Sequence, residues 1–195
     1  AANLHMVDAG TITGAAAELT TVQISDTGNN GTVTITALEA TLGADLSTIV
    51  AGTITAALAT GDTAKEIAAG AKLGTATVNI AGTGTVTVAA GATVDAANLV
   101  MATTSTITGS ATTLSGVQTS GAGTVAVTAL EDKLDADFST IAADTAFTAA
   151  LNSSGNVTIL ADANLGTATV NISHAGLVTV AAGATVGAAN LHMAD

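Results

Sequence analysis

The amino-acid sequence predicts an all-β protein folded as a β-solenoid, that is, a parallel β-helix in which each coil stacks on the previous one. Three observations lead to this prediction. Strand-like segments with alternating apolar and polar residues recur roughly every 10–11 residues. Proline, tryptophan and tyrosine are absent, so the core must consist of small and β-branched side chains. Long segments of sequence also repeat, as in solenoids whose stacked units bury a shared core.

Two tandem repeats make up almost the whole chain. The recurring segments lie at 73–80 and 165–172, at 85–94 and 177–186, and at 1–8, 96–103 and 188–195. We therefore assign residues 1–95 to repeat 1, residues 96–187 to repeat 2, and residues 188–195 to the start of a third repeat, within one continuous solenoid. The chain is expected to be a window from a longer array.

The strand-like segments of repeat 1 follow one another with turn residues between them. They lie at 3–6, 11–13, 21–24, 32–36, 45–50, 53–55, 73–80 and 85–88, and a further segment at 92–101 continues into repeat 2. Segment 32–36 (TVTIT) alternates strictly, which places Val33 and Ile35 on a buried face. The turn at 25–31 is rich in Gly, Asn and Asp, which tolerate tight bends.

Two segments have helical character. Residues 37–45 are the most helix-like, and residues 64–68 are either one helical turn or a weak strand. Repeat 2 follows the same order as repeat 1. Phe138 replaces Leu46, and we align Phe147 with Ile54, so both phenylalanines are expected in the core.

The number of strands suggests how many coils each repeat contains. About nine strands per repeat divide into three coils of three strands, near 31 residues each. Two strands per coil would give four and a half coils, and successive repeats would then fall on opposite faces. The integer solution is simpler, so we expect about three coils per repeat and a rod of roughly 30 Å.

Tandem immunoglobulin-like β-sandwiches are the alternative fold, because about 100 residues is also their usual size. The missing aromatic core residues and the near-identity of segments only one strand long favour the solenoid.

Charge and composition exclude several function classes. The 195 residues include 15 acidic and 3 basic side chains, for a net charge of −12. Nucleic acids and anionic membranes require clusters of Lys and Arg, so neither is an expected partner. The absence of Cys excludes disulfides and thiol catalysis. The mean hydropathy is +0.59, but the apolar runs are far shorter than the roughly 20 residues of a membrane span.

The sequence texture resembles that of a known class of repeats. Residues 32–49 (TVTITALEATLGADLSTI) and 124–141 (TVAVTALEDKLDADFSTI) are similar to tandem-repeat regions of large secreted bacterial surface proteins, including adhesins, S-layer-like proteins and filament-forming proteins. The resemblance implies a passive stalk or fibre that is extracellular or at the cell surface. The calcium nonapeptide of RTX repeats is absent, so their calcium dependence is not implied.

Acidic residues recur at two positions of the repeat. The pairs are Glu39 with Glu131 and Asp45 with Asp137, and repeat 2 adds Asp132 and Asp135. Hard cations bind where several oxygens converge from a short loop, so these six residues form a candidate calcium site. The alternative is a solvated bend that keeps the edge of the stack soluble. No other cofactor is expected.

No residue pattern indicates catalysis, so the chain is not expected to be an enzyme. There is no GxSxG motif, and no paired acids accompany an aromatic sugar platform. His5 and His192 share one repeat position, which is Val100 in the middle copy, and His174 stands alone. None of the three has a metal-binding partner nearby in the sequence.

The expected function is therefore structural. We expect a repeat of an extracellular fibre, sheath or surface layer that assembles by head-to-tail stacking with copies of itself. The alternative is an adhesin stalk or an ice-binding surface on the same scaffold, because Thr-x-Thr pairs such as Thr11/Thr13 and Thr53/Thr55 recur. These pairs are expected on more than one face.

Overall fold

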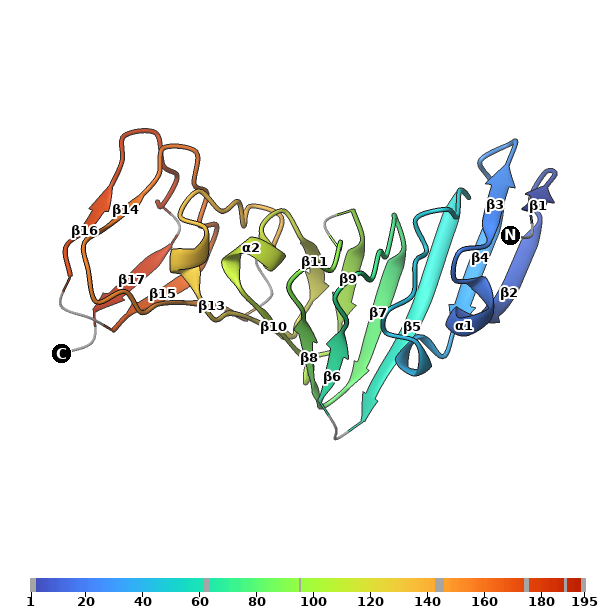
Figure 1. Cartoon of the computed structure of the whole chain (residues 1–195), viewed down its shortest axis with the longest axis horizontal. Helices are drawn as coiled ribbons and strands as arrows, with labels where there is room; N and C mark the ends of the chain where they lie inside the picture. The colour runs from blue at the N-terminus through green and yellow to red at the C-terminus, as the bar shows by residue number, and fades with distance from the viewer. Residues whose placement is uncertain are drawn as a thin grey trace.

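The computed structural model describes residues 3–61, 64–94, 96–142, 146–173, 176–187 and 189–193. It confirms the β-solenoid: about nine turns stack along one axis, and every pair of strands is parallel. Parallel pairing excludes the antiparallel immunoglobulin-like alternative. The molecule is elongated, with the N-terminal and C-terminal strands at opposite ends (Figure 1).

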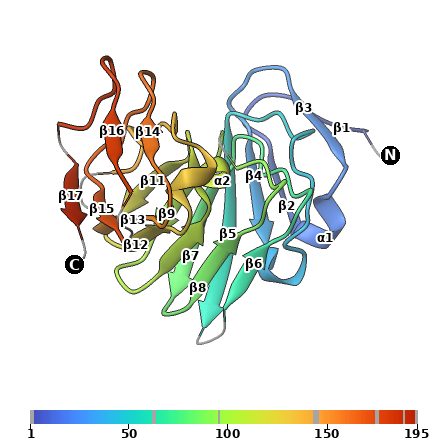
Figure 2. The same cartoon turned by 60° about the vertical axis from the view of Figure 1, so that its left-hand side comes forward.

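Seventeen strands are described, and they form four sheets. The first is a two-stranded N-terminal sheet of β1 (Asn3–Met6) and β3 (Gln23–Asp26). The six-stranded sheet contains β2 (Thr11–Ala15), β4 (Thr32–Thr36), β5 (Thr53–Gly61), β7 (Thr77–Gly82), β9 (Asn98–Met101) and β11 (Gln118–Gly121). The seven-stranded sheet contains β6 (Lys65–Ile67), β8 (Thr85–Val88), β10 (Thr106–Gly109), β12 (Thr124–Val127), β13 (Ala146–Leu151), β15 (Thr169–Ile172) and β17 (Asn190–Met193). In the C-terminal sheet, β14 (Val157–Ile159) and β16 (Val178–Val180) lie side by side (Figure 2).

The coils are shorter than the sequence suggested. Val33 pairs with Ile54, and Val78 pairs with Leu99, 21 residues further along the chain in each case. The expectation of three coils of about 31 residues per repeat is therefore wrong. About nine coils at about 4.8 Å each give a rod of roughly 40 Å.

Each coil is short because only two of its sides are full strands. The third side is a tight turn joined to its neighbours by single-residue bridges, which we call the corner ladder. It consists of Asp45, Lys72 and Thr93 in repeat 1 and of Asp137, Asn164 and Thr185 in repeat 2. The expected number of about nine strands per repeat agrees with the structure, because repeat 1 contains β1 to β8 and a further bridge at Ile49.

Equivalent strands of the two repeats lie on different sheets. Strand β4 lies in the six-stranded sheet, and its copy β12 lies in the seven-stranded sheet. In the same way β7 and its copy β15 lie in different sheets. The identical sequence TVNI is therefore used on both sheets, which the integer solution did not allow.

Backbone hydrogen bonds and buried neighbouring residues hold the corner ladder in place. The Lys72 N–H donates to the carbonyl of Ala44 at 3.0 Å, and the Leu46 N–H donates to the carbonyl of Lys72 at 2.7 Å. Ala44 and Leu46, on either side of Asp45, are both 1% exposed. The buried neighbours thus anchor this corner in the core, while the Asp45 side chain between them reaches solvent.

The core follows the predicted alternation. Val33 and Ile35 are fully buried, as expected. Phe138 and Phe147 are also buried, and their rings meet edge to face with centroids 5.2 Å apart. Phe147 pairs with Val125 as Ile54 pairs with Val33, which confirms the alignment of Phe147 with Ile54.

Helical structure is limited to single turns. The segment expected to be most helical contains η1 (Leu38–Ala40), and its copy contains η2 (Leu130–Asp132). Two further turns, α1 (Ala16–Leu19) and α2 (Ala111–Leu114), were not predicted, because four residues are too few to show a helical period. The ambiguous segment 64–68 forms strand β6. No helix among the described residues is long and apolar enough to cross a membrane.

Candidate functional site

Asp45, one of the two repeated acidic positions, lies on the corner ladder and is already engaged. Its carboxylate accepts the Ser47 hydroxyl at 2.5 Å and the Ser47 N–H at 3.1 Å, and it lies 3.3 Å from the Lys72 ammonium. The bonds from Ser47, with the Lys72 charge, hold the pKa of Asp45 below its ordinary value. This carboxylate closes a turn and forms an ion pair with Lys72 on the next coil. Such exposed ion pairs contribute about 0.2–1 kcal/mol to the free energy of unfolding.

The copy of this position in repeat 2 has a different neighbour. Asp137 accepts the Ser139 N–H at 2.9 Å, as Asp45 accepts that of Ser47. The ladder position of Lys72 is Asn164 in repeat 2, and its side chain accepts the Gly166 N–H at 3.2 Å. The local turn is therefore conserved between the repeats, whereas the ion pair is specific to repeat 1.

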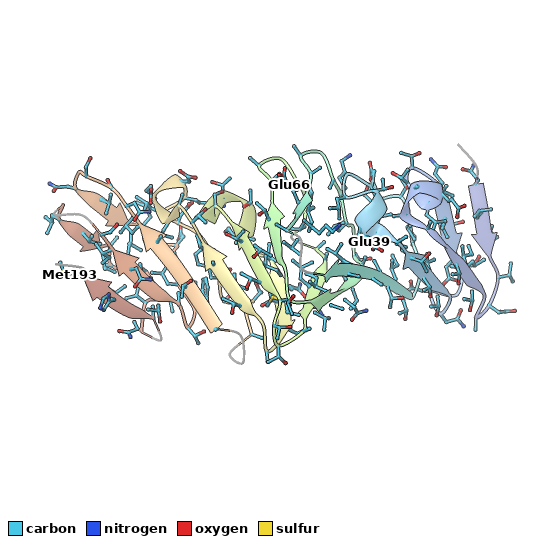
Figure 3. All side chains as sticks on the ribbon, turned by 90° about the horizontal axis from the view of Figure 1, so that it is seen from below. Glu39, Glu66 and Met193 are labelled. Atoms are coloured by element: carbon cyan, nitrogen blue, oxygen red, sulfur yellow. The ribbon has the colours of Figure 1, made fainter. Side chains whose placement is uncertain are left out.

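The remaining candidate calcium ligands lie on or beside the helical turns. Glu39 is in η1, on the flank of the rod (Figure 3), and Glu131 and Asp132 are in η2. The Glu131 carboxylate accepts the N–H of Asn152 from the next coil at 3.2 Å. Asp132 and Asp135 are exposed to solvent.

The described part of the chain contains no group of three or more His, Asp or Glu side chains positioned to hold one metal ion. Calcium binding by Glu39, Asp45, Glu131, Asp132, Asp135 and Asp137 stays a prediction, and the change of Tm in a calcium titration measures it.

Among the described carboxylates Asp26 accepts the most hydrogen bonds from backbone N–H groups, and it is not one of the residues predicted from the sequence. The residue is 9% exposed, and its carboxylate accepts the N–H groups of Gly31 at 2.6 Å, Gly28 at 3.2 Å and Gly52 at 3.4 Å. The Gly31 bond is the largest influence on the pKa of Asp26, and although partial burial opposes it, the pKa is lowered. Asp26 thus fixes the 27–31 loop and ties it to the following coil.

We expect Asp26→Asn to lower the Tm by several degrees at neutral pH, because an amide cannot replace both carboxylate oxygens as acceptors. The folded pKa of Asp26 lies below its unfolded value of about 3.9. Its contribution is therefore complete above that value and is lost as the pH falls through the folded pKa. Thermal unfolding measured from neutral to acidic pH should show the two proteins converging in acid. Asp162→Asn, at an exposed turn, is the control and should change little.

The two described histidines lie on the end strands. On β1, His5 Nδ1 is 2.8 Å from Ser25 Oγ and Nε2 is 2.9 Å from Thr27 Oγ1. His192 occupies the same repeat position on β17 and is exposed. His174 lies outside the described residues. Both ring nitrogens of His5 are therefore engaged by hydroxyl groups, one on β3 and one just after it.

The end strands also expose side chains that are buried inside the rod. Strands β1, β9 and β17 are copies of one segment, NLxM. Leu99 in β9 is 0% exposed, whereas Leu4 in β1 and Leu191 in β17 are each 40% exposed. Met101 is 3% exposed and Met193 is 71% exposed, at the C-terminal end of the rod (Figure 3). The two ends therefore expose apolar side chains that the interior copy of the same segment buries.

The flanks carry ordered threonine rows. In the six-stranded sheet, Thr11, Thr32 and Thr53 stand in one register, beside a second row of Thr13, Thr34, Thr55 and Thr77. The seven-stranded sheet has a row of Thr85, Thr106 and Thr124. The pairs thus lie on more than one face, as expected.

Two surface hollows offer no arrangement of catalytic groups. One, of about 300 Å³, is lined by residues of the corner ladder and α2, and Lys133 is its one ionisable side chain. The other, of about 410 Å³, lies around Ile49 and Gly74 and is lined by no ionisable residue. Neither hollow pairs an acid with a base.

Comparison with protein-family models, with curated proteins and with solved structures found no match for this chain.

Proposed function

We propose that this chain is a structural repeat of an extracellular fibre, sheath or surface layer, and that its activity is head-to-tail stacking of solenoid coils with copies of itself. The observation that best supports this proposal is that the three copies of one segment, in β1, β9 and β17, differ in how far they are exposed. Strand β9 is covered by β7 on one side and β11 on the other, whereas β1 pairs only with β3 and β17 only with β15.

The ends have the physical properties of a stacking surface. Each exposes a row of unpaired backbone groups, which is a template for another strand. Each also exposes inward-facing apolar side chains, among them Leu4, Val180 and Leu191, at 40% each. Burying them as Leu99 is buried would contribute about 25 cal/mol for every Å² of apolar surface removed from water.

Charge favours growth at the ends over association at the sides. The net charge is −12, and acidic side chains such as Glu39, Asp132 and Asp135 lie along the flanks. Two rods side by side would repel each other at low ionic strength. The extracellular or cell-surface location rests on the resemblance of the sequence to secreted bacterial repeats.

Electron microscopy across a concentration series tests the stacking. Thin filaments one rod wide are expected for the natural sequence. Leu191→Asp, on the terminal strand, should raise the concentration needed for filaments by about tenfold or more, equivalent to at least about 1.4 kcal/mol. Val50→Asp is the matched control, because Val50 is 57% exposed but lies within the rod. Equal effects of the two substitutions, or dispersed particles at every concentration, would contradict the proposal.

The threonine rows support a second candidate, an adhesin stalk or ice-binding surface on the same scaffold. Three Thr-x-Thr pairs stack in register on β2, β4 and β5 and form two rows, which gives a regular hydroxyl array. Thermal hysteresis of a non-assembling variant measures this activity. A loss of hysteresis in Thr34→Lys, at the centre of the array, would assign it to this face.

A further inference from the structure

We propose that two separate copies of this chain join by strand exchange, in which β17 of one copy takes the place of β1 beside β3 of the next. The proposal rests on the proposed stacking function and specifies its partner, its strand and its register.

Strands β1 and β17 are interchangeable in sequence, since both read NLHM. Strand β17 pairs with β15 in the register that β9 uses with β7: Val170 faces Leu191 as Val78 faces Leu99. Strand β1 pairs with β3 in the register that β9 uses with β11, with Asn3 facing Gln23 as Asn98 faces Gln118. A composite of β15, β17 and β3 of the next copy therefore reproduces the interior stack of β7, β9 and β11.

Exchange fits the sequence better than simple addition of one end to the other. Addition would place β17 outside β1, so that two NLHM strands lie side by side. No two copies of this segment pair with each other among the described strands. In an exchange, the contacts that β3 loses with β1 are replaced by the same contacts with β17, and Leu191 becomes covered on both sides, as Leu99 is.

The positions of the two histidines also fit an exchange of β17 for β1. His5 contacts Ser25 and Thr27, so His192 would meet those two hydroxyls of the next copy after exchange. The interior copy of this position is Val100, which stands beside Ser120 within the chain. The two strands proposed to exchange thus share a side chain that the permanently enclosed strand lacks.

Cysteine cross-linking tests the register, because the natural sequence contains no cysteine. His5 faces Ser25, so after exchange His192→Cys in one copy would lie about 4.8 Å, between Cα atoms, from Ser25→Cys in the other. A disulfide spans that distance. Mixing the two variants under mild oxidation should give a covalent dimer. Mass spectrometry after trypsin should find residues 134–195 joined to residues 1–65.

Two further pairs make the outcome decisive. Gln23→Cys with His192→Cys is the register control: it places the Cα atoms about 8 Å apart and should give no dimer. His5→Cys with His192→Cys detects addition without exchange. A disulfide in that pair, and none with Ser25→Cys, would overturn exchange while leaving stacking intact. No cross-link in any pair, with a monomer in sedimentation velocity, would overturn both.

Removal of residues 1–8 provides a second, independent measurement. It vacates the edge of β3, so exchange predicts that this variant adds to filaments of the natural chain more readily than the intact chain does, and at both filament ends. If β17 instead docks outside β1, the variant lacks the strand that accepts the β17 of a filament, and it should bind at one filament end only, through its own β17. Binding of the labelled variant, followed by electron microscopy, separates the two outcomes.

Discussion

Replacing Leu99 with alanine is expected to lower the free energy of unfolding by about 2–5 kcal/mol. Leu99 is 0% exposed and lies at the middle of the rod, between β7 and β11. The equivalent changes Leu4→Ala and Leu191→Ala remove the same atoms from positions that are 40% exposed, so each should cost less than half as much in the unassembled chain. Urea unfolding followed by circular dichroism measures all three.

The comparison has a built-in control, because the three leucines occupy one position of the repeat. In assembled material the order should change. Leu191→Ala should then destabilise the filament, since its side chain becomes enclosed, whereas Leu99→Ala should act mainly on the single chain. Equal losses at Leu4, Leu99 and Leu191 in the unassembled chain would show that the ends are already covered.

Gly121→Ala is expected to lower the free energy of unfolding by more than about 3 kcal/mol. This is a larger loss than that expected for Gly70→Ala, its matched control. Gly121 ends strand β11 with φ +90°, and a Cβ there would lie 2.1 Å from the carbonyl oxygen of Met101 on β9. The two coils would have to separate to admit a methyl group. A left-handed backbone adds its own strain for alanine.

Gly70→Ala separates these two causes. Gly70 has φ +85°, but nothing lies within 4 Å of a Cβ at that position. Its substitution should therefore cost only the backbone strain, about 1–2 kcal/mol. Thermal unfolding of both variants gives the comparison. Similar Tm values would mean that β9 and β11 are not as closely stacked as the structure has them.

The strands and the core were accessible from the sequence because period-two alternation is a local signal. Val33 and Ile35 illustrate this, since TVTIT alone predicts which side chains are buried. The coil length was not accessible in the same way. It depends on the corner ladder, where one residue per coil, such as Asp45 or Lys72, forms a bridge. A single bridging residue leaves no periodic pattern, so the number of strands in a repeat does not determine the coil length.

The acidic residues show a similar limit. Asp45 and Asp137 occupy the same position of the two repeats, and each accepts the N–H of the serine two residues later. Asp26 has no acidic counterpart in repeat 2, because the equivalent residue is Gly121, beside a turn three residues shorter. One of the groups that Asp26 binds, the Gly52 N–H, comes from the next coil, and such a contact cannot be found before the coil length is known.

The direction of the strand spacing within assembled material tests the central claim most directly. If copies continue the solenoid end to end, X-ray diffraction from aligned filaments should show a reflection at about 4.8 Å along the filament axis, because strands stack in that direction. Filaments with that spacing across their axis would mean that rods associate through their flanks, and would contradict the account.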